Sequence, residues 1–221
     1  VFNLKPRWKI IAQLTLGFVI VLSGFRIQFI DLPFTGMNTD LGYLSWPVTI
    51  LWIVGVMNAF NLIDGLDGLA GGVVITSAGI FALISFFNGE IAITLLLVIV
   101  MGATFGFWLF NRSPAVIFMG DSGSYLLGYI MSILSLWATE NERGSQTLAP
   151  LLVLAFPLID TFLSLFRRYL KGIPFYSADR DHLHHRLINK GFSHDQITWF
   201  MIGITIVFGT MGGIIIFFPK L

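Results

Sequence analysis

The chain has 221 residues, of which 56% are hydrophobic and only 11% carry a charge. Its mean hydropathy is +0.84, whereas roughly 25% of the residues in an ordinary soluble domain are charged. These values indicate an integral membrane protein. The net charge of +1 gives no reason to expect a nucleic-acid partner, and the lack of cysteine excludes disulfides, thiolate metal sites and cysteine nucleophiles.

Seven hydrophobic segments approach the roughly 20 helical residues that cross a bilayer core. They cover residues 9–29, 44–62, 70–88, 91–109, 124–139, 148–166 and 197–218. Lipid cannot satisfy backbone polar groups, and the segments lack the alternation of a barrel, so all are predicted to be helices. The predicted fold is an all-α, polytopic membrane helix bundle in which residues 1–221 form one domain.

Basic residues gather in alternate loops. The N-terminus and the loops 61–70, 110–123 and 167–196 contain ten: Lys5, Arg7, Lys9, Arg112, Arg167, Arg168, Lys171, Arg180, Arg186 and Lys190. The opposite loops contain three: Arg26, Arg143 and Lys220. The positive-inside rule therefore predicts that the first set faces the cytoplasm. The same loops hold every unusual polar cluster, which predicts one cytoplasm-facing site.

The first polar cluster is NAFNLIDGLDGLAGG, residues 58–72. Asn58, Asn61 and Asp64 are three residues apart, so they follow one slowly drifting face while the span stays helical. Asp-Gly then occurs at 64–65 and again at 67–68, and this dipeptide favours turns because glycine accepts a positive φ. The helix is predicted to end here with its carboxylates facing protein or water. Capping of the next helix is the simpler alternative for any one of these residues.

The second cluster contains GDSGS, which is predicted to place Asp121 just before a helix whose first turn is 122–124. The free N–H groups of a helix N-terminus attract phosphate, whereas a carboxylate repels it unless a cation lies between them. Mg²⁺ held by carboxylate and phosphate oxygens suits this arrangement. Asp121 acting only as an N-cap is the alternative.

The third cluster contains His182, His184 and His185 among aspartates and arginines. H-x-H-H is a poor match to the i, i+4 histidine pair of a zinc helix. Imidazole beside arginine suits a diphosphate better, because both groups donate hydrogen bonds to anionic oxygen. A solvated charged loop is the alternative.

Together the clusters suggest phosphoryl transfer onto a lipid. An ion-coupled transporter also keeps carboxylates in its membrane helices, but near the midplane and not at one face. An intramembrane aspartyl protease using Asp121 and Asp160 is a second alternative, and it leaves the histidines and the double Asp-Gly unexplained.

The three clusters, ending in DRDHLHHRL, resemble the polyprenyl-phosphate N-acetylhexosamine-1-phosphate transferases of bacterial envelope polysaccharide synthesis. HLHH is similar to the WecA/TagO type more than to the phospho-N-acetylmuramoyl-pentapeptide transferase branch. The resemblance implies transfer of a sugar 1-phosphate, expected to be GlcNAc 1-phosphate, from a UDP-N-acetylhexosamine to undecaprenyl phosphate, with release of UMP. It also implies Mg²⁺, with Mn²⁺ as an alternative, and an active site on the cytoplasmic side of the bacterial inner membrane. A homodimer is a further expectation.

Residue roles follow from the same resemblance. Asp121 matches the family's magnesium-binding aspartate, and Asp64 and Asp67 match catalytic positions. The remaining candidates are expected to bind substrate: Asn58 and Asn61 beside the aspartates, Asn111 and Phe118 at the uridine, and Arg168, His182, His184 and His185 at the diphosphate. Either an aspartate deprotonates the lipid phosphate or a covalent intermediate forms.

One departure concerns the N-terminus. Family members carry D-D-x-x-[DN]-L-x-x-x-x-K, and VFNLKPRWK is what should follow the aspartate pair, with Asn3 at its third position. The family normally has about ten or eleven spans, each of the length that a bilayer requires. The chain is therefore expected to be an N-terminally truncated fragment that is inactive alone.

Overall fold

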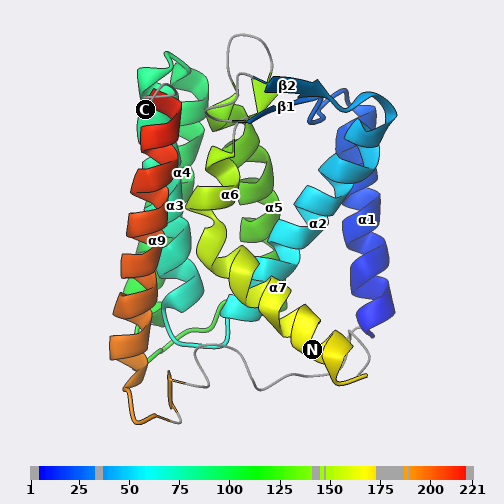
Figure 1. Cartoon of the computed structure of the whole chain (residues 1–221). Helices are drawn as coiled ribbons and strands as arrows, with labels where there is room; N and C mark the ends of the chain where they lie inside the picture. The colour runs from blue at the N-terminus through cyan, green and yellow to red at the C-terminus, as the bar shows by residue number, and fades with distance from the viewer. Residues whose placement is uncertain are drawn as a thin grey trace.

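The structure is a computed structural model that describes residues 5–32, 37–140, 145–146, 148–172, 187–188 and 190–217. It is a bundle of helices (Figure 1) that run as α1 (Pro6–Leu22), α2 (Ser45–Ile63), α3 (Leu69–Phe87), α4 (Ile91–Asn111), α5 (Gly120–Thr139), α6 (Ala149–Val153), α7 (Ala155–Leu170) and α9 (His194–Phe217). A small sheet closes one end in the order β2-β1-β3, where β1 is Phe29–Leu32, β2 is Met37–Asp40 and β3 is Ser145–Gln146. Strand β1 is antiparallel to β2 and parallel to β3.

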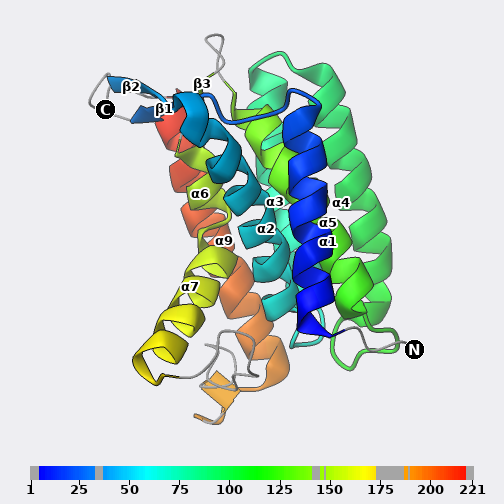
Figure 2. The same ribbon diagram turned by 90° about the vertical axis from the view of Figure 1, so that its right-hand side faces the viewer.

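The all-α prediction is confirmed. Four helices of the described chain are long and apolar enough to cross a membrane: Gly42–Ile63, which includes a short 3-10 turn before α2, together with α3, α4 and α9. Helix α3 is the most buried of these and packs against α4, α5 and α9. Helix α2 packs against α1, α5 and α7, and Figure 2 shows α1 standing along the outside of α2 and α5.

Two predicted spans have different bounds in the structure. The first ends at Leu22 instead of residue 29, because the chain turns at Gly24 with a φ of 94° and then forms β1. The sixth is broken at Leu154 into α6 and α7. Pro157 explains this break, since proline has no N–H to donate to the carbonyl of Val153 and its ring crowds that carbonyl.

The predicted alternation of loops holds. The start of α1, the α2–α3 turn, the α4–α5 loop and the end of α7 lie at one end of the bundle, drawn at the bottom of Figure 1. The sheet and the α3–α4 turn lie at the opposite end. Both views show α7 leaning away from the other helices toward the lower end. The first two polar clusters and the end of α7 therefore lie at the same end of the bundle.

Candidate functional site

The ends of two helices bring the first two polar clusters together. Helix α2 ends at Ile63 with Asp64 as its C-cap, as predicted. Helix α5 begins at Gly120, so Asp121 lies in its first turn and not before it, which corrects the predicted start at residue 122. Asp121 is consequently not an N-cap, and its carboxylate is left for partners on other helices.

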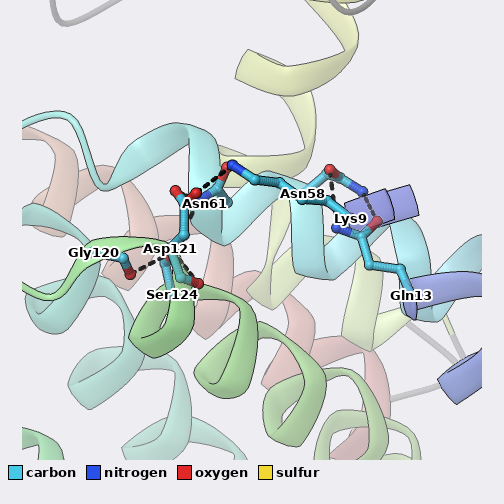
Figure 3. A network of polar contacts seen from close by, with 7 residues as sticks. All are labelled: Lys9, Gln13, Asn58, Asn61, Gly120, Asp121 and Ser124. Carbon is cyan, nitrogen blue, oxygen red and sulfur yellow. Dashed lines mark hydrogen bonds and ion pairs between the residues drawn. The ribbon is translucent and has the colours of Figure 1, made fainter. Parts of the chain in front are cut away.

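The Asp121 carboxylate is the centre of the site (Figure 3). One of its oxygens pairs with the ammonium of Lys9 on α1, and the other accepts a hydrogen bond of 3.0 Å from the Asn61 side-chain amide on α2. The same amide lies 3.0 Å from the Ser124 hydroxyl. The side chain of Asp121 is still 54% exposed. Three helices therefore fix this carboxylate while leaving it open to a ligand.

The pKa values of the two aspartates of the site, Asp64 and Asp121, are shifted in opposite directions. Lys9, followed by Asn61, holds the pKa of Asp121 below its ordinary value. Burial, and then repulsion from Asp121, raises the pKa of Asp64 to about 7, although the backbone N–H of Gly120 donates to its carboxylate. Asp64 and Asp121 are thus close enough to interact, and they carry unlike proton affinities.

Hydrogen bonds join the α2–α3 turn to the α4–α5 loop through Asp67, Gly68 and Asn111. The Asp67 carboxylate accepts a hydrogen bond of 3.0 Å from the backbone N–H of Ala115. The Asn111 side chain accepts one of 3.1 Å from Gly68 N–H and donates one of 2.8 Å to the carbonyl of Ile117. Gly68 has a φ of 75°, and a Cβ there would lie 3.1 Å from both the Arg112 backbone and the Trp108 ring nitrogen. These contacts hold the α4–α5 loop against the α2–α3 turn.

The other predicted site residues have varied surroundings. Asn58 is half-buried, and its amide donates to the carbonyl of Val54 and to Gln13 on α1. Phe118 is 75% exposed in the α4–α5 loop. Arg168 is buried on α7. His182, His184 and His185 lie outside the described residues.

Two cavities are of interest, one beside Asp67 and one nearer the sheet end of the bundle. One of about 360 Å³ lies behind Asp67, and Trp108, Arg112 and Trp199 contribute to its wall. A second, of about 490 Å³, is an apolar groove between α2 and α7 whose wall includes Trp52, Leu158 and Phe162. The wall of the groove also includes Ile27 and Ile30 at the sheet end, whereas the first cavity is lined by the α4–α5 loop and the start of α9.

Sequence reasoning did not single out Lys9 or Gln13, which the structure brings to the site or beside it. Lys9 is the lysine that ends the D-D-x-x-[DN]-L-x-x-x-x-K pattern, so the pattern itself was a usable signal. Gln13 was marked only by being an amide within an apolar run. Neither contact was visible from spacing, because Lys9 and Asp121 are 112 residues apart.

The donor set suits Mg²⁺. The described residues contain no group of three or more His, Asp or Glu side chains arranged around one point. Mg²⁺ is typically held by one or two carboxylates together with substrate phosphates and water, so a larger set is not required. The exposed Asp121 carboxylate, with Asp64 beside it, supplies the hard oxygen ligands that this ion prefers.

Comparison with known proteins gives consistent matches. A family model described as glycosyl transferase family 4 matches residues 1–139. A probable undecaprenyl-phosphate N-acetylglucosaminyl 1-phosphate transferase of Bacillus subtilis is 39% identical over 194 residues, which cover 87% of this chain and 54% of the relative. A decaprenyl-phosphate N-acetylglucosaminephosphotransferase of Mycobacterium tuberculosis is 32% identical over 238 residues, 96% of this chain and 59% of the relative.

A third relative, the undecaprenyl-phosphate alpha-N-acetylglucosaminyl 1-phosphate transferase of Yersinia pestis, is 26% identical over 228 residues, 99% of this chain and 62% of the relative. The chain thus spans between 54% and 62% of the length of these three relatives. All three relatives are named as sugar 1-phosphate transferases that act on a polyprenyl phosphate.

Proposed function

Because the chain belongs to glycosyl transferase family 4, we propose that its protein transfers N-acetylglucosamine 1-phosphate from UDP-N-acetylglucosamine to undecaprenyl phosphate. UMP is the second product, and the reaction is the initiating step of cell-envelope polysaccharide synthesis. The site faces the cytoplasm from the bacterial inner membrane. The names of the relatives support the sugar phosphate and the polyprenyl acceptor.

The observation that carries the proposal is the meeting of Lys9, Asn61 and Asp121 beside Asp64. A cation, an amide donor and two carboxylates lie together at the membrane boundary of three helices. Phosphoryl transfer needs little covalent chemistry from the protein and depends mostly on positioning and charge stabilisation. A transporter would instead be expected to hold its carboxylates near the midplane, so this arrangement favours the transferase.

Asp121 and Asp64 are the residues proposed to hold Mg²⁺. When bound, the ion would neutralise charge on the phosphate oxygens of the diphosphate. Lys9 and Asn61 orient the Asp121 carboxylate, and Lys9 adds a positive charge beside the reacting phosphates. The exposed ring of Phe118 is available to stack on uracil, and Asn111 holds the loop that carries this ring. Arg168 and the histidines 182, 184 and 185 are proposed to bind the diphosphate.

The apolar groove between α2 and α7 is proposed to hold the isoprenoid chain of the acceptor. Its wall consists mainly of aliphatic and aromatic side chains, which come from α2, α5, α6, α7 and the segment 27–30. Burial of apolar lipid against such a wall is favourable and non-directional, which suits a chain that must slide. The phosphate of the acceptor would then lie toward the end of the bundle that carries Asp121.

The proposed step breaks one bond and forms one. An oxygen of the lipid phosphate attacks the sugar-linked phosphorus of the UDP-sugar. The bond from that phosphorus to the bridging oxygen breaks, and this oxygen leaves with its electron pair on UMP. The product is a lipid diphosphate sugar, so the two phosphates of the donor end on different molecules.

The test uses the protein expressed from its whole gene, undecaprenyl phosphate, Mg²⁺ and UDP-sugars labelled in the sugar. Labelled lipid and free UMP are expected to appear in equal amounts. Asp121→Asn is expected to lower Mg²⁺-dependent turnover at least about a hundredfold, since the loss of one charge-stabilising group commonly costs this much. No lipid product with any UDP-N-acetylhexosamine would refute the proposal, and near wild-type turnover of the variant would refute the role of Asp121.

A further inference from the structure

A second layer of polar side chains lies one helical turn deeper in the bundle than the site. Each of three helices contributes two of them: Lys9 and Gln13 on α1, Asn58 and Asn61 on α2, and Asp121 and Tyr125 on α5. Residues three or four positions apart lie on the same face of a helix, about one turn from each other. The outer layer is therefore Lys9, Asn61 and Asp121, and the inner layer is Gln13, Asn58 and Tyr125.

The inner layer is centred on Gln13. The Asn58 amide donates a hydrogen bond of 2.7 Å to the Gln13 side-chain oxygen, and the Gln13 amide lies 3.5 Å from the Asn58 oxygen (Figure 3). The side chain of Tyr125 on α5 lies close to that of Gln13. Gln13 thus joins its own helix to α2 and lies near α5, the helix whose Asp121 pairs with Lys9 one turn away.

Because Gln13 is buried, its side chain keeps its hydrogen-bond partners in only one position of α1. Gln13 is only 2% exposed, although most of the side chains around it on α1 are exposed and apolar. A buried amide without partners is costly, and hydrogen bonds between membrane helices hold neighbouring helices together. Sliding or turning α1 by one residue would break the Gln13 contacts. The same movement would carry Lys9 away from Asp121.

We infer that Gln13 is a positioning residue: by its buried hydrogen bond to Asn58 it sets the register of α1, and so holds the Lys9 ammonium on the Asp121 carboxylate. The relevance of this role to catalysis rests on the proposed function. It also gives Asn58 a contact inside the protein that its predicted role in substrate binding did not include. Gln13 itself touches no reacting atom in this arrangement.

Lysine reactivity tests the register without reference to activity. In the full protein, Lys9 is modified competitively with a trace amine-reactive reagent and quantified by mass spectrometry, with exposed Lys5 as the internal reference. Gln13→Leu, which keeps the bulk but removes the amide, is expected to raise the Lys9-to-Lys5 ratio at least threefold. Thr15→Val is the matched control, because Thr15 lies on the same helix, is exposed, and bonds only to the carbonyl of Ile11.

Steady-state kinetics tests the effect of Gln13 on turnover. Gln13→Leu is expected to lower kcat about tenfold, the order seen when a group that orients a ligand is lost, while KM for UDP-N-acetylglucosamine stays within twofold.

Three results would overturn the inference. They are an unchanged Lys9 ratio in Gln13→Leu, an equal rise in Thr15→Val, or a rise of all lysines together with loss of folded protein. If no preparation transfers sugar phosphate, the proposed function fails, whereas the labelling result still decides whether Gln13 sets the position of Lys9.

Discussion

Asp64 and Asp67 are three residues apart in one turn, yet they have different surroundings. The carboxylate of Asp64 lies beside Asp121, whereas that of Asp67 accepts the N–H of Ala115 in the next loop. The sequence predicted a catalytic role for both. The contact of Asp67 supports a role in holding the loop, which an amide oxygen could also fill.

Substitutions at Asp67 can separate charge from hydrogen bonding. Asp67→Asn keeps an acceptor for Ala115 and is expected to retain turnover within about tenfold. Asp67→Ala leaves a backbone N–H without its partner, which costs about 1–3 kcal/mol, and is expected to lose more activity and to lower the unfolding temperature. Turnover and thermal unfolding of both variants check this. A near-complete loss in the amide variant would instead assign Asp67 to catalysis by its charge.

At the opposite end of the bundle, Glu140 offers a test of pH dependence. Desolvation, followed by repulsion from Glu90, raises the pKa of Glu140 above its ordinary value of 4.5. The folded state therefore holds this proton more tightly than the unfolded state does. The resulting stabilisation is present below pH 4.5 and is lost as pH rises through the raised pKa.

Glu140→Gln is accordingly expected to raise the unfolding temperature at pH 8 by about 1–2 °C, with no gain near pH 4. Glu90→Gln removes only the second cause, so its gain should have the same sign and be smaller. Thermal unfolding in detergent over this pH range measures both. A constant difference between wild type and Glu140→Gln at every pH would contradict the assignment.

Much of the residue-scale site could be predicted. The motifs identified Asp64, Asp121 and Asn61, and the structure brings these three together. The partners Lys9 and Gln13 depend on how α1 packs, which local spacing does not encode. Asn111 matched the expected motif, but its two hydrogen bonds to the turn and the loop could be seen only once both segments were placed.

Helices α2 and α5 approach each other closely at Gly128. A Cβ there would lie 2.7 Å from the Met57 Cα and 3.2 Å from the Val56 carbonyl oxygen, both of which are backbone atoms. Because Asn61 and Asp121 lie on these same two helices, the crossing sets their separation. Glycine is needed at position 128 because the two helices lie so close together, and not because the backbone there has a positive φ.

Gly128→Ala is therefore expected to destabilise the protein by about 1–3 kcal/mol, as overpacking does, and to lower turnover by moving Asn61 from Asp121. Gly106→Ala on α4 is the matched control, since a Cβ there meets nothing within 4 Å, and a change within about 0.5 kcal/mol is expected. Unfolding and turnover are measured on both. Equal effects of the two substitutions would show that the crossing is not tight.

At the scale of helices, hydropathy predicted where helices lie but not where they break. The bounds of α2, α3, α4 and α9 agree with the predicted spans within three residues. The end of α1 and the break between α6 and α7 were missed, because a hydropathy window averages over Gly24 and Pro157. Proline at 157 was the one signal in the sequence that could have indicated the second break.

Orientation of the bundle can be tested with single cysteines, because these 221 residues contain none. Tyr43 is 99% exposed at the end with the sheet, and Val116 is 76% exposed at the end with Asp121. Tyr43→Cys is expected to react with a membrane-impermeant maleimide in intact cells, and Val116→Cys only after permeabilisation. The wild-type chain gives the background. The reverse pattern would place the site outside the cytoplasm.

The division between helices that meet the length and hydropathy of a membrane span and those that do not has a consequence for biogenesis. Within the described chain, α1, α6 and α7 have fewer than 18 residues, and α5 is long enough but less apolar than the four candidate spans. Helices α1 and α5 carry Lys9, Gln13 and Asp121, so the polar groups that build the site also weaken membrane insertion. These helices are expected to depend on α2 and α3 for retention by the translocon. Selection for independent insertion would therefore oppose selection for chemistry.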